Sequence, residues 1–449
     1  MREHLLELGQ RAVQAALRAG ASEAEAYVVE GVSAETIFTD KVESFRISAS
    51  TGLGIRAIVG KKLGMMGTSS LEPDDVVRAA EEAVKIARAS SEDEEWRSLP
   101  ERYGRTEVEG LYDEETAALE PEAIMDYIFR AIEAVKSAGP NVSPSRGLLR
   151  AGRSVVAICN SYGQEAVREG TSAIVWVRAS AREAGRKATG SESACARALS
   201  AIDFERLGSE AGRRALDFLR AKKLPTGKMD VVIRGMVMGG MLSTMFGRTL
   251  TADAVQEKRS PWAGKVGQEV ASEALTLVDD GVMPGGFRSR PFDDEGVRTG
   301  RTVLVERGVL KGFLYDDYRA KREGVSSTGN AWRPHYRSRP SPAPNCLLLQ
   351  PGDWRLEELL ADTSGGLYVV ETIGEWLSDP IRGFLNATVT HGYLIEDGEL
   401  GQPVSGITIS CDFFQAMRGP MDALGRELEC HMGIYAPPVR IRGMSISGK

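Results

Sequence analysis

The sequence predicts an α+β protein: an N-terminal α+β region with helices packed on antiparallel sheets, and a mainly antiparallel β C-terminal domain with few helices. Two observations support this fold class. Helical periodicity alternates with short apolar runs in the first half, whereas short runs separated by Gly-containing turns dominate from Met229 onward. The 449 residues are enough for two or three domains. We expect an N-terminal module over residues 1–90, a middle α+β region over 91–227 and a β-rich C-terminal domain over 228–449.

The N-terminal module is predicted as a helix, a strand meander and a second helix. Apolar residues from Leu5 to Leu17 are spaced as one face of a helix that ends near Gly20. The second helix begins at Pro73, which suits a first helical turn, and ends near Ser90. Between the helices, apolar runs broken by Gly and polar residues predict short antiparallel strands at residues 25–30, 34–39, 45–50, 53–59 and 63–67.

The middle region is expected to begin with a polar, acidic linker at residues 90–95. The same periodicity criteria then predict helices and one strand pair joined by a turn. These elements are helices at residues 121–138 and 203–219, a loop at 140–145, strands at 154–160 and 171–180, and a turn at 160–163.

The C-terminal domain contains one strongly apolar helix candidate, at residues 236–246. Its methionines and glycines favour a buried, closely packed helix, and the alternative is a Met-lined surface that receives a peptide or a partner helix. Gly308 and Gly398 lie at the tips of two predicted hairpins, where a tight turn requires a positive φ. A late helix is expected at residues 413–424.

Composition narrows the class of protein. The net charge of -7 disfavours a nucleic-acid-binding surface, which needs a basic excess. No apolar run approaches the roughly 18 residues of a membrane-spanning helix, and the N-terminus has no signal-peptide pattern. The five cysteines lack CxxC or other paired spacing, which indicates reduced thiols. We therefore expect a cytoplasmic protein that binds neither nucleic acid nor membrane.

Three groups of short motifs follow one another downstream of Met229. They are Ala263-Gly264-Lys265-Val266-Gly267 with Val278-Asp279-Asp280-Gly281; Asp293-Asp294-Glu295-Gly296 with residues 302–312; and Ser327-Thr328-Gly329-Asn330 with Arg339-Pro340 and Asn345. In order and spacing, more than in any single motif, they resemble the catalytic region of the TldD/PmbA family, the zinc-dependent peptidases also called modulators of DNA gyrase.

The family's zinc motif is absent from this chain. Counting back from Gly264 at the family spacing of HExxxH places Ser243 and Thr244 at the His-Glu pair and Arg248 at the second His. A gap-free count back from Pro438 places Leu424 at the third ligand, a cysteine in catalytic members. The resemblance therefore implies the metal-free TldE (PmbA) type, with no catalytic residue, metal or cofactor of its own and with zinc in a TldD-type partner.

A physical check on the residues agrees with the missing motif. Catalytic zinc needs about three protein ligands, and an arginine is a permanent cation that cannot ligate it. No two of the chain's histidines stand within one helical turn of each other, so no helix presents a His pair. These histidines are His4, His335, His391 and His431.

The remaining candidates are weaker. The resemblance places Thr328, Gly329 and Asn330 near the family's substrate channel, where Asn330 would shape a peptide groove, and a plain turn is the alternative. The carboxylates at 279–280 and 293–295 are expected to be structural, with arginine partners. A basic-aromatic cluster is a candidate contact for an acidic peptide or a partner subunit, with an exposed loop as the alternative. It comprises Arg333, His335, Tyr336, Arg337 and Arg339.

By resemblance, the chain is a non-catalytic subunit of a TldD/TldE-type zinc metalloprotease that degrades or processes unfolded peptides. Its partner would be a TldD-type subunit in a heterodimer, or a second copy of itself in a homodimer. Two alternatives stay open, namely a stand-alone homodimer that binds peptides without cleaving them, and a peptidase with an unrecognised site. The least implausible such site is a Cys346–His335 dyad, which would require the two residues to meet in space.

Overall fold

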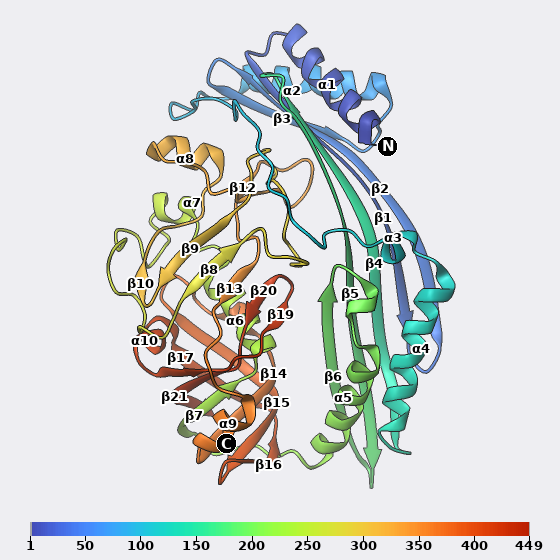
Figure 1. The fold of residues 1–449 in the computed structure, drawn as a ribbon, viewed down its shortest axis with the longest axis vertical. Coiled ribbons are helices and arrows are strands. Elements are labelled where there is room, and N and C mark those ends of the chain that lie inside the picture. Colours follow the sequence, from blue (N-terminus) through green and yellow to red (C-terminus); the bar gives the residue numbers. More distant parts are fainter. Residues whose placement is uncertain (1, 449) are drawn as a thin grey trace.

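A computed structural model describes residues 2–448 and confirms the α+β class. The N-terminal half is one six-stranded antiparallel sheet in the order β3-β2-β1-β4-β5-β6, so strands from the first two predicted regions share a sheet. The sheet is long and curved, and the C-terminal domain lies against its concave side (Figure 1). The strands are β1 Glu23–Phe38, β2 Val42–Val59, β3 Lys62–Thr68, β4 Val142–Asn160, β5 Glu165–Glu183 and β6 Arg186–Ala196.

Successive side chains of each strand point to opposite faces of the N-terminal sheet, and each face packs against another part of the protein. Val175, Val177 and Ala179 of β5 face the helix pair α4–α5, whereas Tyr27 and Val156 face the C-terminal domain around Phe292. The second helix pair, α1–α2, covers the other end of the helical face. The helices are α1 Arg2–Arg18, α2 Pro73–Ala89, α3 Glu114–Ala118, α4 Pro121–Ser137 and α5 Phe204–Asp217.

The strands are longer than the sequence predicted. The runs expected at 25–30 and 34–39 are both parts of β1, those at 45–50 and 53–59 are parts of β2, and the expected loop at 140–145 begins β4. The reason lies in the residues between the apolar runs. Small and polar side chains there read as breaks, yet the ladder continues through them, with Gly31 opposite both Ser50 and Ser154.

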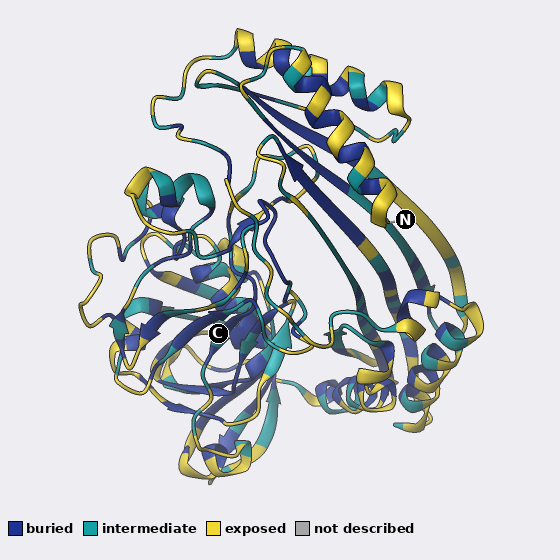
Figure 2. Ribbon diagram, turned by 45° about the horizontal axis from the view of Figure 1, so that its top comes forward, coloured by how far each residue is buried: buried dark blue, intermediate teal, exposed yellow. Residues whose placement is uncertain are grey.

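The middle of β2 has no cover. Residues 46–50 are exposed on both faces, and β3 pairs with β2 only from Leu53 onward, so the outer edge of this segment has no partner strand within residues 2–448. Ile47 is 52% exposed. Figure 2 shows this part of β2 as a continuous exposed stretch at the edge of the sheet.

The C-terminal domain combines two sheets. The larger has the order β14-β7-β21-β17-β15-β16, and an additional β14–β15 pairing closes it on itself. The smaller has the order β10-β9-β8-β13-β20-β19. The strands of the larger sheet are β7 Gly227–Ile233, β14 Gly365–Ile373, β15 Phe384–Glu396, β16 Glu399–Val404, β17 Ile407–Asp412, β18 Met421–Leu424 and β21 Val439–Ser447. Those of the smaller sheet are β8 Leu277–Asp280, β9 Arg301–Glu306, β10 Val309–Leu310, β13 Leu347–Leu349, β19 Glu429–His431 and β20 Ile434–Ala436.

The largest core cluster lies between these sheets and includes the apolar helix α6, Gly235–Phe246. Met238, Met241 and Met245 are buried, as expected for a packed helix. Both predicted hairpins are present, with positive φ at Gly308 and Gly398. The late helix was predicted too long: α10 spans Phe413–Arg418 and strand β18 follows, because Gly419-Pro420 interrupts the helix.

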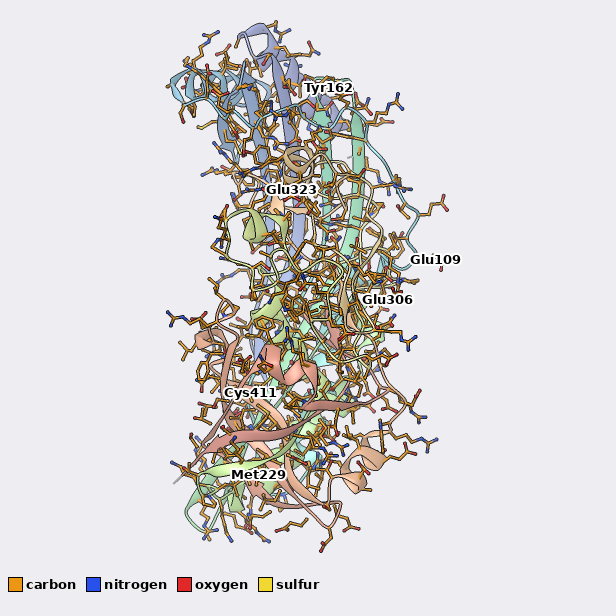
Figure 3. The ribbon with its side chains drawn as sticks, turned by 90° about the vertical axis from the view of Figure 1, so that its left-hand side faces the viewer. Glu109, Tyr162, Met229, Glu306, Glu323 and Cys411 are labelled. Carbon is orange, nitrogen blue, oxygen red and sulfur yellow. The ribbon has the colours of Figure 1, made fainter. Side chains whose placement is uncertain are left out.

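Viewed from the side, the molecule is elongated, with Tyr162 near one end and Met229 near the other (Figure 3). The contact between the N-terminal sheet and the C-terminal domain therefore extends along the molecule. Short elements complete the C-terminal domain: α7 Ala252–Gln256, α8 Asp317–Glu323, α9 Leu356–Asp362, β11 Ala331–Trp332 and β12 Ser341–Pro342.

Candidate functional site

Two neighbouring cavities lie between the N-terminal sheet and helix α6. The first, of about 480 Å³, is lined from β4 and β5, from the end of α6 and from the loop after β8. The second, of about 430 Å³, is lined from β6, the start of α6 and β14. Ser243 lines both cavities, so α6 forms their common wall.

The hairpin β19–β20 positions α6. Gly235 and Gly239 allow this approach, since a Cβ on Gly235 would lie 2.4 Å from the Ala436 carbonyl oxygen, and one on Gly239 2.8 Å from the His431 Cβ. Glu429 accepts a hydrogen bond from the Met236 N–H at the beginning of the helix, at 2.9 Å. A carboxylate at this end of a helix is favoured by the helix dipole.

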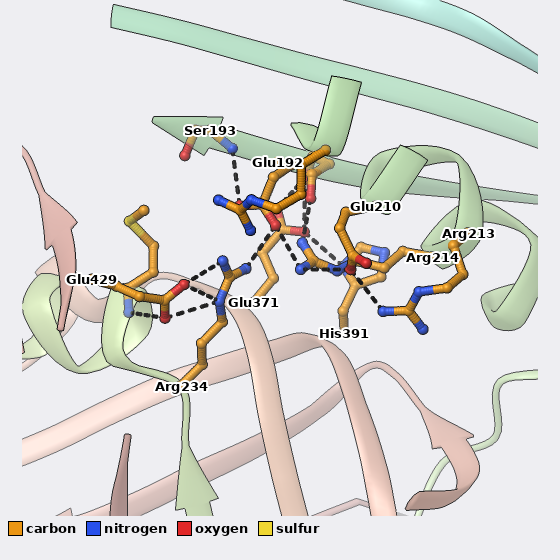
Figure 4. Close-up of polar contacts among 12 residues, drawn as sticks. Glu192, Ser193, Glu210, Arg213, Arg214, Arg234, Glu371, His391 and Glu429 are labelled. Atoms are coloured by element: carbon orange, nitrogen blue, oxygen red, sulfur yellow. Dashed lines mark hydrogen bonds and ion pairs between the residues drawn. The ribbon is translucent and has the colours of Figure 1, made fainter. Parts of the chain in front are cut away.

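Arg234, just before α6, connects three elements (Figure 4). Its Nε donates to Glu429 Oε1 at 2.8 Å, and its Nη1 donates to Glu192 Oε2 of β6 at 2.9 Å. Glu192 also pairs with Arg214 of α5 at 2.6 Å. Burial opposes the charge on Glu192, but Arg214 and Arg234 outweigh it and hold the pKa of Glu192 below its ordinary value. The N-terminal sheet is thus fixed to the base of α6.

Glu371, which lines the second cavity, is paired with His391 of β15, which is buried. Glu371 Oε2 lies 2.9 Å from His391 Nδ1, and Ser191 Oγ donates to Glu371 Oε1 at 2.7 Å. Burial works against ionisation of Glu371, yet His391 and Ser191 hold its pKa below the ordinary value. His391 also packs edge-on against Phe218, with ring centroids 4.4 Å apart. Since Ser191 donates to the carboxylate and not to the imidazole, this arrangement is not that of a nucleophilic serine.

Three of the four positions aligned with the zinc motif reach these cavities. Ser243 is exposed at their junction, Thr244 lines the second and Arg248 lines the first. Leu424 does not: it lies in β18 opposite Val439 and belongs to the domain core. The gap-free count therefore leads to a strand of the domain core, whereas the segment that faces α6 is the hairpin β19–β20.

The structure adds two residues to the site that the sequence did not assign to it, Glu429 and His431. His431 lines the second cavity, and its ring lies 3.7 Å from the position of a Cβ on Gly240. In the sequence, Cys430 and His431 are neighbours in this segment. Cys430 lies across from Cys195 of β6, with the two Sγ atoms 3.4 Å apart and both thiols free.

The predicted channel residues form a support behind the first cavity. Asn330 is fully buried and donates from Nδ2 to Asp279 Oδ2 at 2.7 Å. Asn345, which lines the cavity, donates to the Gly329 carbonyl oxygen at 3.2 Å. Thr328 Oγ1 accepts from the Tyr315 N–H at 2.7 Å. The turn therefore fixes Asn345, and Asn330 has no surface with which to touch a substrate.

The basic-aromatic cluster is divided by the fold. Arg333 is buried and pairs with Glu25 of β1, which also pairs with Arg56 at 2.8 Å. Arg333 is thus unavailable to an acidic peptide, contrary to that hypothesis. Tyr336 packs on β2, where a Cβ on Gly54 would lie 1.8 Å from the Tyr336 carbonyl oxygen. His335, Arg337 and Arg339 remain exposed.

The Cys346–His335 dyad is not formed. Cys346 is fully buried, its Sγ lies 3.5 Å from Ser289 Oγ, and burial raises the pKa of its thiol to about 11. His335 lies in an exposed loop, where its Nδ1 accepts from the Arg337 N–H. Across residues 2–448, the structure groups no three His, Cys, Asp or Glu side chains in a way that could hold a metal ion. Nor does any helix within those residues have the length and apolar character needed to cross a membrane.

The sequence matches three successive metallopeptidase domains, which define the class of protein. Residues 24–87 match PmbA/TldA metallopeptidase domain 1, residues 114–219 the central domain and residues 226–448 the C-terminal domain. The chain belongs to the PmbA/TldD family of metallopeptidases.

The sequence is similar to those of known metalloproteases over nearly its whole length. It is 28% identical to Metalloprotease MJ0996 of Methanocaldococcus jannaschii, over 89% of this chain and 88% of that one. It is 25% identical to Metalloprotease PmbA of Escherichia coli O157:H7, over 93% and 90% of the two chains. The crystal structure of TldE from Thermococcus kodakarensis has the same fold, with a TM-score of 0.92 at 24% identity, over 98% of this chain and all of that one (100%).

Proposed function

We propose that this chain is the non-catalytic, TldE/PmbA-type subunit of a two-component zinc metalloprotease that acts on unfolded peptides. One observation carries the proposal. Helix α6 borders both cavities, but the positions aligned with the zinc motif in this helix and just after it are Ser243, Thr244 and Arg248. A serine, a threonine and an arginine do not form a zinc site.

In this proposal the partner supplies zinc, which polarises the scissile carbonyl group and activates water. This chain supplies a wall of the chamber. The cavities lie between two domains that Arg234, Glu192 and Glu429 hold together, so the wall is preformed rather than assembled on binding. A narrow chamber of this kind would admit an extended peptide and exclude a folded protein.

The uncovered part of β2 supports a partner subunit. Residues 46–50 expose both faces and an outer strand edge, and an exposed strand edge invites pairing with another chain. We propose that a TldD-type subunit covers it. A second copy of this chain is the alternative occupant, which would give the peptide-binding homodimer. The free thiols of all five cysteines support a reducing, cytoplasmic location.

The proposal is tested by metal analysis and a peptidase assay on the purified chain, alone and mixed with a TldD-type subunit from the same genome. We expect no stoichiometric zinc and no cleavage from the chain alone, and cleavage from the mixture. The matched control is a mixture in which the glutamate of the partner's HExxxH motif is changed to Gln, and this mixture should be inactive. Cleavage that persists in the control would place the active site in this chain and contradict the proposal.

A further inference from the structure

The first cavity is lined by five arginines from separate parts of the chain. Arg168 belongs to β5, Arg197 follows β6, Arg248 follows α6, and Arg288 and Arg290 belong to the loop after β8. The only acidic side chain on the same lining is Glu169, and it pairs with Arg2. Positive charge therefore accumulates at this cavity although the chain as a whole is acidic.

Two of these arginines are neutralised from behind. Asp294 is buried and pairs with Arg168 and, at 3.2 Å, with Arg290. Burial is the largest single effect on the pKa of Asp294 and raises it, but Arg168 and Arg290 together outweigh burial and hold the pKa below its ordinary value. One carboxylate thus serves two guanidinium groups, and the cavity keeps a positive excess.

Arg197 is held in place by backbone alone. Its guanidinium donates to the carbonyl oxygens of Thr171 at 3.0 Å, Gly286 at 3.1 Å and Ser289 at 2.6 Å. Carbonyl groups orient a guanidinium but do not neutralise it, and these bonds use three of its five N–H groups. Burial, with the neighbouring charges of Arg168 and Arg290, lowers the pKa of Arg197. An anion in the cavity would relieve that repulsion.

Arg248 and Arg288 are exposed at the cavity, and neither forms an ion pair with a carboxylate in the part of the chain that the structure describes. The lining also includes apolar side chains, among them Val156, Pro291 and Trp332. A volume of about 480 Å³ falls within the range of roughly 300–1,000 Å³ that is usual for small-molecule sites. Guanidinium forks bind carboxylates in a bidentate manner, and apolar lining residues suit the neighbouring peptide side chains.

We propose that this arginine cavity binds a carboxylate group of the peptide substrate, either its C-terminal carboxylate or an acidic side chain. The inference rests on the proposed function, because the ligand is taken to be a peptide. It gives Arg248 a role: at the position where catalytic relatives would carry a zinc ligand, this chain presents a cation that holds the substrate beside the chamber.

The test measures binding of a fluorescent flexible peptide to the purified chain by anisotropy, without a partner subunit. The peptide carries one internal Asp and a free C-terminus, and two matched peptides carry a C-terminal amide or Asn in place of Asp. We expect Arg248→Ala and Arg288→Ala each to weaken binding about tenfold, since hydrogen bonds to charged groups are among the stronger ones. The control Arg130→Ala, on the outer surface of α4, should bind like the wild type.

The matched peptides identify the source of the carboxylate. Weaker binding of the amide assigns the C-terminus, and weaker binding of the Asn peptide assigns the side chain. Equal binding of all three peptides, or binding unaffected by both substitutions, would overturn the inference. So would a single-stranded DNA oligonucleotide that displaces the peptide and binds more tightly. Because the partner is absent, a failed peptidase assay would contradict the proposed function and leave this result intact.

Discussion

Two of the charged regions at which the N-terminal sheet and the C-terminal domain meet differ in one respect. In the interdomain ion network, formed by Glu25, Arg56, Glu295 and Arg333, every charged side chain is buried and has an opposite charge as partner. In the arginine cavity, Arg248 and Arg288 are exposed and have none among residues 2–448. Residues of the same types thus hold the domains together in one region and leave charge available to a ligand in the other.

Burial and pairing, rather than residue type, distinguish the two roles. Removing a charge from water costs roughly several kcal/mol per ion, so a buried charge needs a partner of opposite sign. An exposed arginine remains hydrated, so it has no such desolvation cost and stays available to a ligand. From the sequence, the cluster around Arg333 was a candidate contact for a ligand, and Arg248 was only a position that had lost its zinc ligand. In the structure, Arg333 is instead buried in the interface between the domains.

The largest effect is expected from the interdomain ion network. Glu25→Gln leaves Arg333 without a carboxylate partner and removes one of the two from Arg56. Breaking a buried ion pair from one side costs about 3–5 kcal/mol in the free energy of unfolding, measurable by urea denaturation. Asp126→Asn, which breaks the exposed pair with Arg130, is the control and should cost about 0.5 kcal/mol or less. Equal losses from the two variants would remove the distinction between the regions.

A pH-dependent effect is expected behind the cavity wall. Burial raises the pKa of Asp279 to about 6 from an ordinary 3.8, and Asn330 and Asn345 only partly oppose it. The stabilising contribution of the protonated form is complete below pH 3.8 and is lost as the pH rises through about 6. Asp279→Asn should therefore increase stability at pH 8 relative to the wild type, by up to about 3 kcal/mol, and have little effect at pH 4.

Urea denaturation at a series of pH values checks this prediction. Asp293, whose pKa burial raises to about 7 with a further contribution from Glu295, remains in the variant and should keep a separate step. Asp294 has its pKa lowered, so its contribution has the opposite sign and is lost as the pH falls. An unchanged step near pH 6 in Asp279→Asn would contradict the assignment.

An intermediate effect is expected where the two domains approach through glycine. Gly54→Ala would place a Cβ 1.8 Å from the Tyr336 carbonyl oxygen, so β2 and the loop must separate. We expect a loss of about 1–3 kcal/mol in the free energy of unfolding, as for other overpacked contacts. Gly227→Ala is the matched strand control, because no atom lies within 4 Å of its added Cβ. A neutral Gly54→Ala would mean that this contact is not tight.

The smallest effect on stability is expected in the arginine cavity. Arg248→Ala removes no ion pair and should change the free energy of unfolding by no more than about 0.5 kcal/mol. Together with weakened peptide binding, that result would mark Arg248 as a ligand contact. A loss of stability as large as that of Glu25→Gln would instead assign it to the structure.

Local patterns predicted the helices well and the strands less well. Pro73 and Pro121 each begin a helix where expected, because their effect on a first turn is local. The length of β1 and β2 was missed because the residues between the predicted runs, such as Gly31 in β1 and Gly52 in β2, carry no strand signal of their own and are ordered by cross-strand pairing. The edge strand β6, composed largely of small and charged residues, gave no signal for the same reason.

At the site, Ser243, Thr244 and Arg248, which the family spacing aligned with the zinc motif, line the cavities, whereas Leu424 lies in the domain core. The hairpin that faces α6, β19–β20, comes after Leu424 in the sequence. Glu429 and His431 lie beside α6 although they are far from it in the sequence; Arg234 and Glu429, for example, are 195 residues apart. No local pattern encodes such a contact.

The most direct test of the central claim is peptide cleavage by this chain alone and together with a TldD-type subunit, with zinc content measured in each sample. The account predicts that the chain alone contains no stoichiometric zinc and cleaves nothing, and that the mixture cleaves an unfolded peptide through the partner's zinc. Zinc-dependent cleavage by the chain alone would contradict it and would require a metal site outside Ser243, Thr244 and Arg248.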